Sequence, residues 1–197
     1  MRIVAAAKTV DAEAVGWVVE AGAADVGHNY VRELRAMRPE VPRARWHYIG
    51  ALQTSSAHHV AAAADVVQTL ASPRAAERLA RRAAEAGRRI EALIEVDLTG
   101  ARSGVPPDDV QGFARSVLAL EGLELTGLMT LPPIPTDPED GRPYFAQLRN
   151  LRDRLREIAP GVVECSMGMS LDYEVAAEEG ATMVRIGTAL FGPRTPQ

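Results

Sequence analysis

Several residue types are scarce in this sequence, and each shortage excludes a class of protein. Cys165 is the only cysteine, so the chain has no disulfide framework and a reducing, cytoplasmic setting is expected. No apolar run approaches membrane-spanning length, and no charged leader stands before an apolar segment at the N-terminus. We therefore expect a protein that is neither exported nor inserted in a membrane.

Excess positive charge and metal-ligand patterns are lacking as well. The net charge is -4 and the isoelectric point about 5.6, which argues against a nucleic-acid partner bound through phosphate neutralisation. His58 and His59 have no nearby cysteine or acidic ligand pattern, so a metal site is not expected. No serine lies in a G-x-S-x-G elbow, and we assign no catalytic residue.

The sequence does contain enough apolar residues for one core. With 197 residues, of which 47% are hydrophobic, the chain suits a single domain over residues 1–197 and is short for two. Short apolar runs alternate with longer amphipathic stretches, which is typical of βα units around a parallel sheet. The predicted strands are residues 3–7, 25–27, 46–49, 66–70, 90–96, 123–129, 162–165 and 182–186. The predicted helices include residues 12–21, 73–86, 106–120, 144–159 and 171–179.

This alternation predicts an α/β fold, a single (β/α)8 barrel of the TIM type. A doubly wound open sheet is the competing architecture, but no G-x-G-x-x-G turn follows the first predicted strand. The irregular, proline-rich residues 131–143 follow the sixth predicted strand, and loops in that position border the active site of a barrel.

Lys8 is the only lysine, and it ends the apolar run of residues 3–7. Burial disfavours an ammonium ion, so a lysine held at a strand end can lose its proton and attack an aldehyde. The alternative is that Lys8 simply carries the chain from the strand into solvent. The lone amine is therefore a Schiff-base hypothesis that needs a second feature to support it.

The second feature is a predicted phosphate site at the far end of the chain. Ser170 is predicted to cap a helix, and Thr188 follows flexible Gly187, both beyond the last two predicted strands. The loops after strands seven and eight of a barrel often bind phosphate. Alternatively, Ser170 only caps a helix and Gly187 only permits a turn. An amine for an aldehyde together with a phosphate site suggests pyridoxal phosphate.

Arg185 lies within the last apolar strand, between Val184 and Ile186. A buried guanidinium requires partners for its hydrogen bonds. One candidate is a ring nitrogen of a cofactor, and the other is a buried carboxylate such as Asp97 or Glu95. We expect His47 to make a structural hydrogen bond near the barrel mouth.

Six motifs occur in one order along the chain: residues 7–9 (AKT), 27–33 (GHNYVRE), 46–53 (WHYIGALQ), 127–129 (GLM), 166–170 (SMGMS) and 183–192 (MVRIGTALFG). Together they resemble the pyridoxal phosphate homeostasis proteins, which are similar to the N-terminal barrel of alanine racemase. The resemblance implies that pyridoxal phosphate is the cofactor and that Lys8 forms its internal aldimine. It also implies that the remaining cofactor contacts come from Met169, Ser170, Gly187 and Thr188 at the phosphate, Arg185 at the pyridine nitrogen and Asn29 near the ring.

The sequence departs from this family in three places. It starts almost at the first strand, so the usual N-terminal helix is expected to be missing. His28 stands where the family commonly has Glu, and Ser55-Ser56 stand where it has Asn-Lys. None of these changes affects Lys8, so we expect cofactor binding to survive.

The resemblance implies intracellular vitamin B6 homeostasis with little or no turnover. We expect a monomer whose partners are pyridoxal phosphate and, through it, apo-enzymes that require this cofactor. Two alternatives remain open: an amino-acid racemase or other Schiff-base enzyme, and an aldolase-like lyase that uses Lys8 without a cofactor. A racemase needs a second acid or base, which related enzymes take from a further domain.

Overall fold

The computed structural model describes residues 1–192, in which eight parallel strands close into a barrel in sequence order. The strands are β1 (Arg2–Ala6), β2 (Asp25–His28), β3 (Arg45–Tyr48), β4 (Val66–Leu70), β5 (Ile90–Val96), β6 (Leu123–Thr130), β7 (Glu164–Ser166) and β8 (Met183–Ile186). Closure comes from the parallel pairing of β8 with β1, in which Ala5 is opposite Ile186. The predicted (β/α)8 barrel of the TIM type is confirmed.

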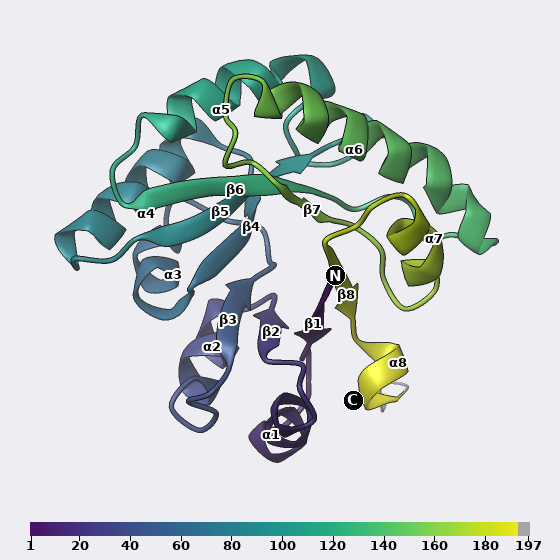
Figure 1. Cartoon of the computed structure of the whole chain (residues 1–197). Coiled ribbons are helices and arrows are strands. Elements are labelled where there is room, and N and C mark those ends of the chain that lie inside the picture. The colour runs from purple at the N-terminus through teal and green to yellow at the C-terminus, as the bar shows by residue number, and fades with distance from the viewer. Residues whose placement is uncertain (193–197) are drawn as a thin grey trace.

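Helices surround the barrel in Figure 1, each following a strand. They are α1 (Ala12–Glu20), α2 (Val31–Met37), α3 (Ala57–Ala63), α4 (Pro73–Glu85), α5 (Val110–Leu118), α6 (Arg142–Arg156), α7 (Tyr173–Glu178) and α8 (Thr188–Phe191), with 3-10 turns at Pro107–Asp109 and Pro138–Gly141. Among the described residues, no helix has both the length and the apolar content needed to cross a bilayer.

Local sequence explains where several helices begin. Asp11 caps α1, because its carboxylate accepts a hydrogen bond from the Ala14 N–H at 2.8 Å. Pro73 occupies the first turn of α4, where its missing N–H costs nothing. The prediction that Ser170 caps the next helix is wrong: α7 begins at Tyr173, and Asp172 is its N-cap.

Apolar side chains form two layers of core. The larger layer lies between the strands and the helices and includes the fully buried Trp46 and Phe145. A small cluster comprises residues from five strands, namely Val4, Val66, Leu93, Met129 and Met183. Side chains alternate between the two faces of a strand, so the strands of the barrel contribute to both layers.

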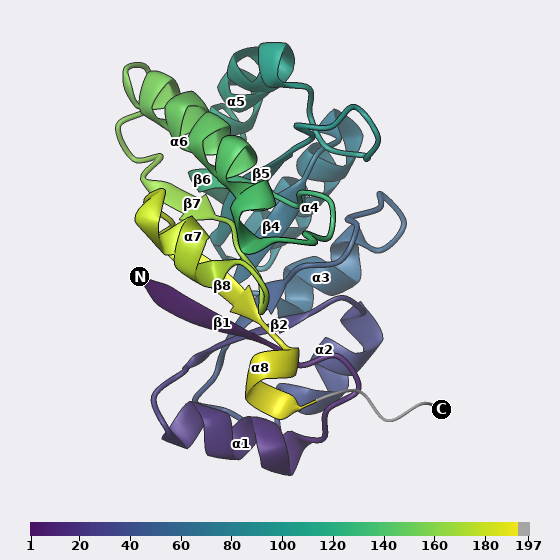
Figure 2. The same cartoon turned by 90° about the vertical axis from the view of Figure 1, so that its right-hand side faces the viewer.

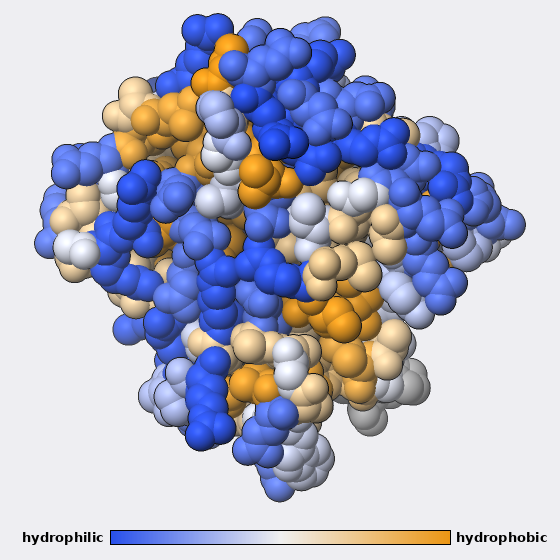
Figure 3. All heavy atoms as spheres, viewed as in Figure 1, coloured by the Kyte–Doolittle hydropathy of each residue, from blue (hydrophilic) through white to orange (hydrophobic). Residues whose placement is uncertain are grey.

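The strand starts form a charged end of the barrel. Arg2 donates to Glu164 at 2.7 Å, and Asp25 lies 3.9 Å from both Arg2 and Arg45. Arg45 also pairs with Glu91. Figure 3 views this end and shows a hydrophilic centre with hydrophobic areas to its sides. These pairs occupy the strand starts, whereas active sites of barrels of this type lie at the opposite end, where the strands stop.

Candidate functional site

Lys8 lies two residues beyond β1 and is half-buried. Its Nζ is 5.7 Å from the centre of the Tyr30 ring, a cation–π distance. Thr9, the next residue, has φ of 62°, which is strained for a β-branched side chain, and its hydroxyl donates to the Lys8 carbonyl at 2.6 Å. The chain is therefore held in a tight turn at the point where the amine leaves the strand.

A cavity of about 480 Å³ brings three of the predicted site residues together. Lys8, Gly187 and Thr188 line it at the strand ends. Its other walls include Trp17 of α1 and Phe191 of α8. Figure 2 shows β1 and β8 side by side and α8 directly after β8. Lys8 and Thr188 thus line the same cavity, although they are 180 positions apart in the sequence.

The loop after β7 is tied to the start of α8. The Ser170 hydroxyl accepts a hydrogen bond from the Ala189 N–H at 3.3 Å, next to Thr188. The Met169 N–H donates to the Asp172 carboxylate at 2.6 Å. Ser170 is therefore beside the Gly187–Thr188 segment, as the phosphate prediction requires, while the Met169 N–H already has a protein partner.

Asn29 directly follows β2, whose pairing with β1 places Ala6 opposite Gly27. The Asn29 side chain is exposed, and its backbone is packed closely against Gly50. Asn29 and Lys8 therefore continue neighbouring strands at the same end of the barrel.

Arg185 is buried in β8 and uses neutral oxygens as partners. It donates to the Ser166 hydroxyl at 2.7 Å and to the Thr130 carbonyl at 2.8 Å. Burial lowers the pKa of Arg185 to about 10, against the opposing charges of Glu95 and Asp172. Within residues 1–192, no carboxylate lies at ion-pair distance from Arg185.

The two carboxylates considered for Arg185 have other environments. Asp97 is wrong as a direct partner, because its carboxylate accepts hydrogen bonds from the N–H groups of Thr99, Gly100 and Arg102. Glu95 acts on Arg185 through charge alone, and burial raises the pKa of Glu95 while the Arg185 charge opposes that change.

His47 makes a structural hydrogen bond, as predicted, but its carboxylate partner lies at the other end of the barrel. Its Nε2 lies 2.7 Å from Asp25, the first residue of β2, and its Nδ1 lies 2.8 Å from the Gln68 amide nitrogen. Burial lowers the pKa of His47, although Asp25 acts to raise it. The neutral imidazole is the favoured form.

Sequence reasoning missed Gln68, Tyr30 and the contact between Ser166 and Arg185. Gln68 is fully buried within β4 and is the only amide side chain in an otherwise apolar and hydroxyl-bearing strand. A buried polar residue in an apolar run is an informative signal, so Gln68 could have been identified. Tyr30 gave no such signal. In the described part of the chain, no three His, Cys, Asp or Glu side chains are grouped to hold a metal ion.

Comparison with known proteins places this barrel in a family. Residues 2–195 match the model of the alanine racemase N-terminal domain. A pyridoxal phosphate homeostasis protein of Aquifex aeolicus is 38% identical over 198 residues, covering 98% of this chain and 87% of the relative. The chain belongs to the pyridoxal phosphate homeostasis protein family. A bovine member of the family is 33% identical and covers 98% of this chain and 77% of its own length.

Solved structures agree with this membership. PipY of Synechococcus elongatus, determined with PLP bound, has a TM-score of 0.90 and 33% identity, covering 98% of this chain and 92% of PipY. Alanine racemase of Clostridium difficile has a TM-score of 0.77 at 18% identity, covering 100% of this chain and 56% of the racemase. The racemase likeness shows the shared fold, whereas PipY is similar in both sequence and fold.

Proposed function

We propose that this protein binds pyridoxal phosphate and that Lys8 holds it as a Schiff base. The observation that carries the proposal is the position of the only lysine: Lys8 is half-buried and shares a cavity with Gly187 and Thr188. A Schiff base forms when an unprotonated amine attacks an aldehyde and water leaves. PipY, which is 33% identical to this chain, was determined with PLP bound, and this supports the same cofactor here.

The surrounding residues fit the other parts of this cofactor. Ser170, on the loop after β7, and Thr188, the first residue of α8, supply hydroxyls for a phosphate. Gly187 supplies backbone next to Thr188, Met169 precedes Ser170 with its N–H bonded to Asp172, and Asn29 follows the strand next to that of Lys8. Arg185 is charged and buried in β8, directly before these loops, which suits contact with a ring nitrogen.

In the cell, we propose a homeostasis or carrier function with little turnover. The names of the relatives support this biological function. A charged Arg185 beside the ring nitrogen would disfavour a proton there, and the bound cofactor would then be a weak electron sink. We further expect a cytoplasmic monomer that supplies the cofactor to apo-enzymes. The racemase reading is the alternative that turnover measurements test.

Borohydride reduction tests the Schiff base directly. Protein incubated with pyridoxal phosphate should turn yellow, lose its imine absorption on reduction, and carry one added pyridoxyl group on the peptide that contains Lys8. Lys8→Ala should stay colourless while melting at the wild-type temperature. Colourless wild-type protein in excess cofactor would disprove the proposal and leave the cofactor-free lyase reading. An adduct on the amino terminus would disprove the assignment of Lys8.

A further inference from the structure

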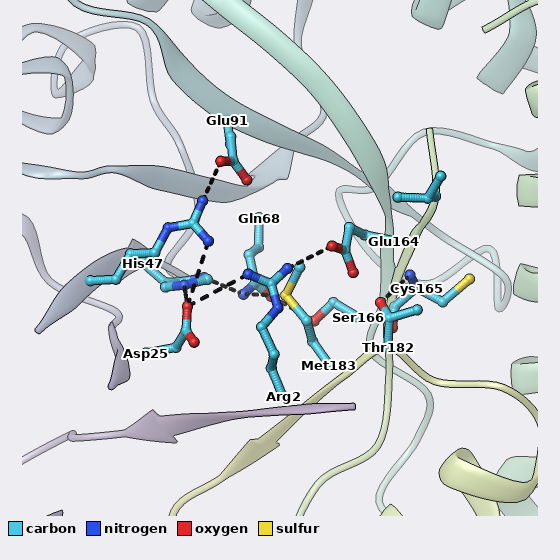
Figure 4. A network of polar contacts seen from close by, with 12 residues as sticks. Arg2, Asp25, His47, Gln68, Glu91, Glu164, Cys165, Ser166, Thr182 and Met183 are labelled. Carbon is cyan, nitrogen blue, oxygen red and sulfur yellow. Dashed lines mark hydrogen bonds and ion pairs between the residues drawn. The ribbon is translucent and has the colours of Figure 1, made fainter. Parts of the chain in front are cut away.

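A line of hydrogen-bonded side chains crosses the inside of the barrel from Arg185 to Asp25. Arg185 Nη1 lies 2.7 Å from Ser166 Oγ, and Ser166 Oγ lies 2.6 Å from Gln68 Oε1. Gln68 Nε2 lies 2.8 Å from His47 Nδ1, and His47 Nε2 lies 2.7 Å from Asp25 Oδ1. Figure 4 shows the part from Ser166 to Asp25, with Asp25 placed between His47 and Arg2. Five residues from five strands thus form one continuous line.

The two ends of this line fix the direction of every bond in it. A guanidinium only donates, so the Ser166 hydroxyl must accept from Arg185 and turn its own hydrogen toward Gln68. Gln68 then accepts through Oε1 and donates through Nε2 to His47. An ionised carboxylate only accepts, so Asp25 requires the His47 proton on Nε2, which leaves Nδ1 free to accept. Both ends demand the same arrangement, and the distances satisfy it.

This direction matters electrostatically. Each N–H or O–H dipole in the line points its positive end toward Asp25 and its negative end toward Arg185. Aligned hydrogen bonds in a low-dielectric interior strengthen one another. Arg185 has no carboxylate at ion-pair distance within residues 1–192, so the line and the Thr130 carbonyl compensate its burial.

The charges around His47 support a neutral ring in this line. Asp25 of β2 favours the imidazolium, whereas Arg2 of β1 and Arg45 of β3 disfavour it. Gln68 of β4 presents a donor to Nδ1, so a proton there would face another proton. Burial and these contacts together keep a single tautomer.

We propose that Ser166, Gln68 and His47 are positioning residues that hold Arg185 charged and oriented at the barrel mouth. Arg185 has five N–H donors, and Ser166 and Thr130 account for two of them. The line fixes the guanidinium plane and so determines where the remaining donors point. The contact between these donors and the cofactor rests on the proposed function. The line of hydrogen bonds does not depend on the proposed function.

The first test needs no cofactor. Imidazole ¹⁵N shifts of the protein without cofactor should show His47 as the neutral Nε2–H tautomer at about pH 7. Gln68→Glu replaces the amide donor with an acceptor, so Nδ1 should gain a proton and His47 should become an imidazolium at the same pH. A wild-type Nδ1–H tautomer, or an unchanged His47 in Gln68→Glu, would overturn the directed line.

The second test uses the protein loaded with pyridoxal phosphate. Ser166→Ala removes the charge-assisted hydrogen bond to Arg185, and Gln68→Leu removes the partner that orients the Ser166 hydroxyl. Each variant should weaken cofactor retention by about tenfold and should shift the pH at which the imine absorption changes. Cys165→Ala is the matched control, because Cys165 is a buried neighbour of Ser166 in β7 outside the line. The control should bind and absorb as wild type does.

The outcomes separate the two proposals. Wild-type retention and an unchanged absorption titration in both Ser166→Ala and Gln68→Leu would show that the line does not position Arg185. Failure of the wild-type protein itself to bind the cofactor would overturn the proposed function, while the His47 tautomer still tests the line. If Ser166→Ala or Gln68→Leu unfolds, the His47 protonation state in the wild type and in Gln68→Glu tests the line instead.

Discussion

We propose that the hydroxyls of Ser170 and Thr188 are the main side-chain contacts to the phosphate. Ser170 already accepts a hydrogen bond from Ala189, which places its oxygen next to the first turn of α8. Ser170→Ala and Thr188→Val should each weaken cofactor retention by about 1–3 kcal/mol, the range for a hydrogen bond to a charged group. The imine should still form at high cofactor concentration, since Lys8 is untouched.

Competitive titration with the phosphorylated and dephosphorylated aldehydes measures this effect. Each variant should lose about 1–3 kcal/mol of the preference for the phosphorylated form. If each variant binds the phosphorylated aldehyde as tightly as wild type does, and likewise the dephosphorylated aldehyde, these hydroxyls do not contact the phosphate.

His28 is a second residue with a measurable consequence, this time for stability in acid. Its ring is buried against Trp46, with centres 6.0 Å apart, and its Nδ1 lies 3.4 Å from Glu33. Burial lowers the pKa of His28, and the opposing charge of Glu33 does not cancel this effect. The unfolded chain therefore binds the proton more tightly, and the folded state loses stability as the pH falls below about 6.5.

Urea unfolding at several pH values tests this prediction. The free energy of unfolding should fall toward acid by at most about 1.4 kcal/mol per pH unit for one such group. His28→Gln should flatten this slope without abolishing it, because His47 contributes in the same direction. His58→Gln, at an exposed position, is the control. A slope that is identical in wild type and His28→Gln would contradict the prediction.

At the scale of elements, the β7–α7 loop depends on Gly168. Its φ is 90°, and a Cβ there would lie 2.5 Å from the Ala176 side chain of α7. Gly168→Ala should therefore combine backbone strain with a steric clash and destabilise the protein by more than about 1–3 kcal/mol. The same change should weaken cofactor retention, because Met169 and Ser170 follow directly.

Gly22→Ala separates the two causes. Gly22 also has a positive φ, 108°, but a Cβ there meets nothing within 4 Å. The Gly22→Ala variant should be destabilised by backbone strain alone and should retain the cofactor normally, as thermal unfolding and an absorption titration would show. Equal losses in the two variants would mean that the contact with Ala176 has no importance.

The elements also show what sequence can and cannot predict. The eight strands could be predicted because strands of a barrel covered by helices are apolar on both faces and stand out as short runs. The helix α2 was missed, since it is seven residues long and its N-cap, Tyr30, makes no side-chain capping bond. The start of α7 was misplaced because Ser170, a good capping residue by type, bonds to Ala189 of another element.

Contacts inside the barrel were beyond sequence analysis for a different reason. The partners of Arg185 are 19 and 55 positions away, and closure of the barrel alone brings them together. Asp97 was a reasonable candidate by charge, but its carboxylate accepts hydrogen bonds from N–H groups of its own loop, those of Thr99 and Arg102. Lys8, Gly187 and Thr188 could be placed together because a barrel aligns all its strand ends at one face.

At the scale of the whole molecule, the barrel separates two kinds of polar chemistry. At the strand starts, positive and negative side chains form ion pairs, among them Arg2 with Glu164. The strand ends hold Lys8 and Arg185, neither of which has a carboxylate partner at ion-pair distance within residues 1–192. Groups that are left without a counter-charge in this way are suited to an anionic ligand.

This separation leads to the last prediction, that the loaded protein is nearly idle toward amino acids. A guanidinium held charged at the ring nitrogen disfavours protonation there, so removal of an α-proton gains little stabilisation. Amino acids should still exchange with Lys8, because that step needs no carbanion. In deuterated water with L-alanine, α-proton exchange and D-alanine formation should both stay far below the ~10 s⁻¹ typical of enzymes. Turnover near that value in wild type, absent from Lys8→Ala, would instead identify the protein as a racemase.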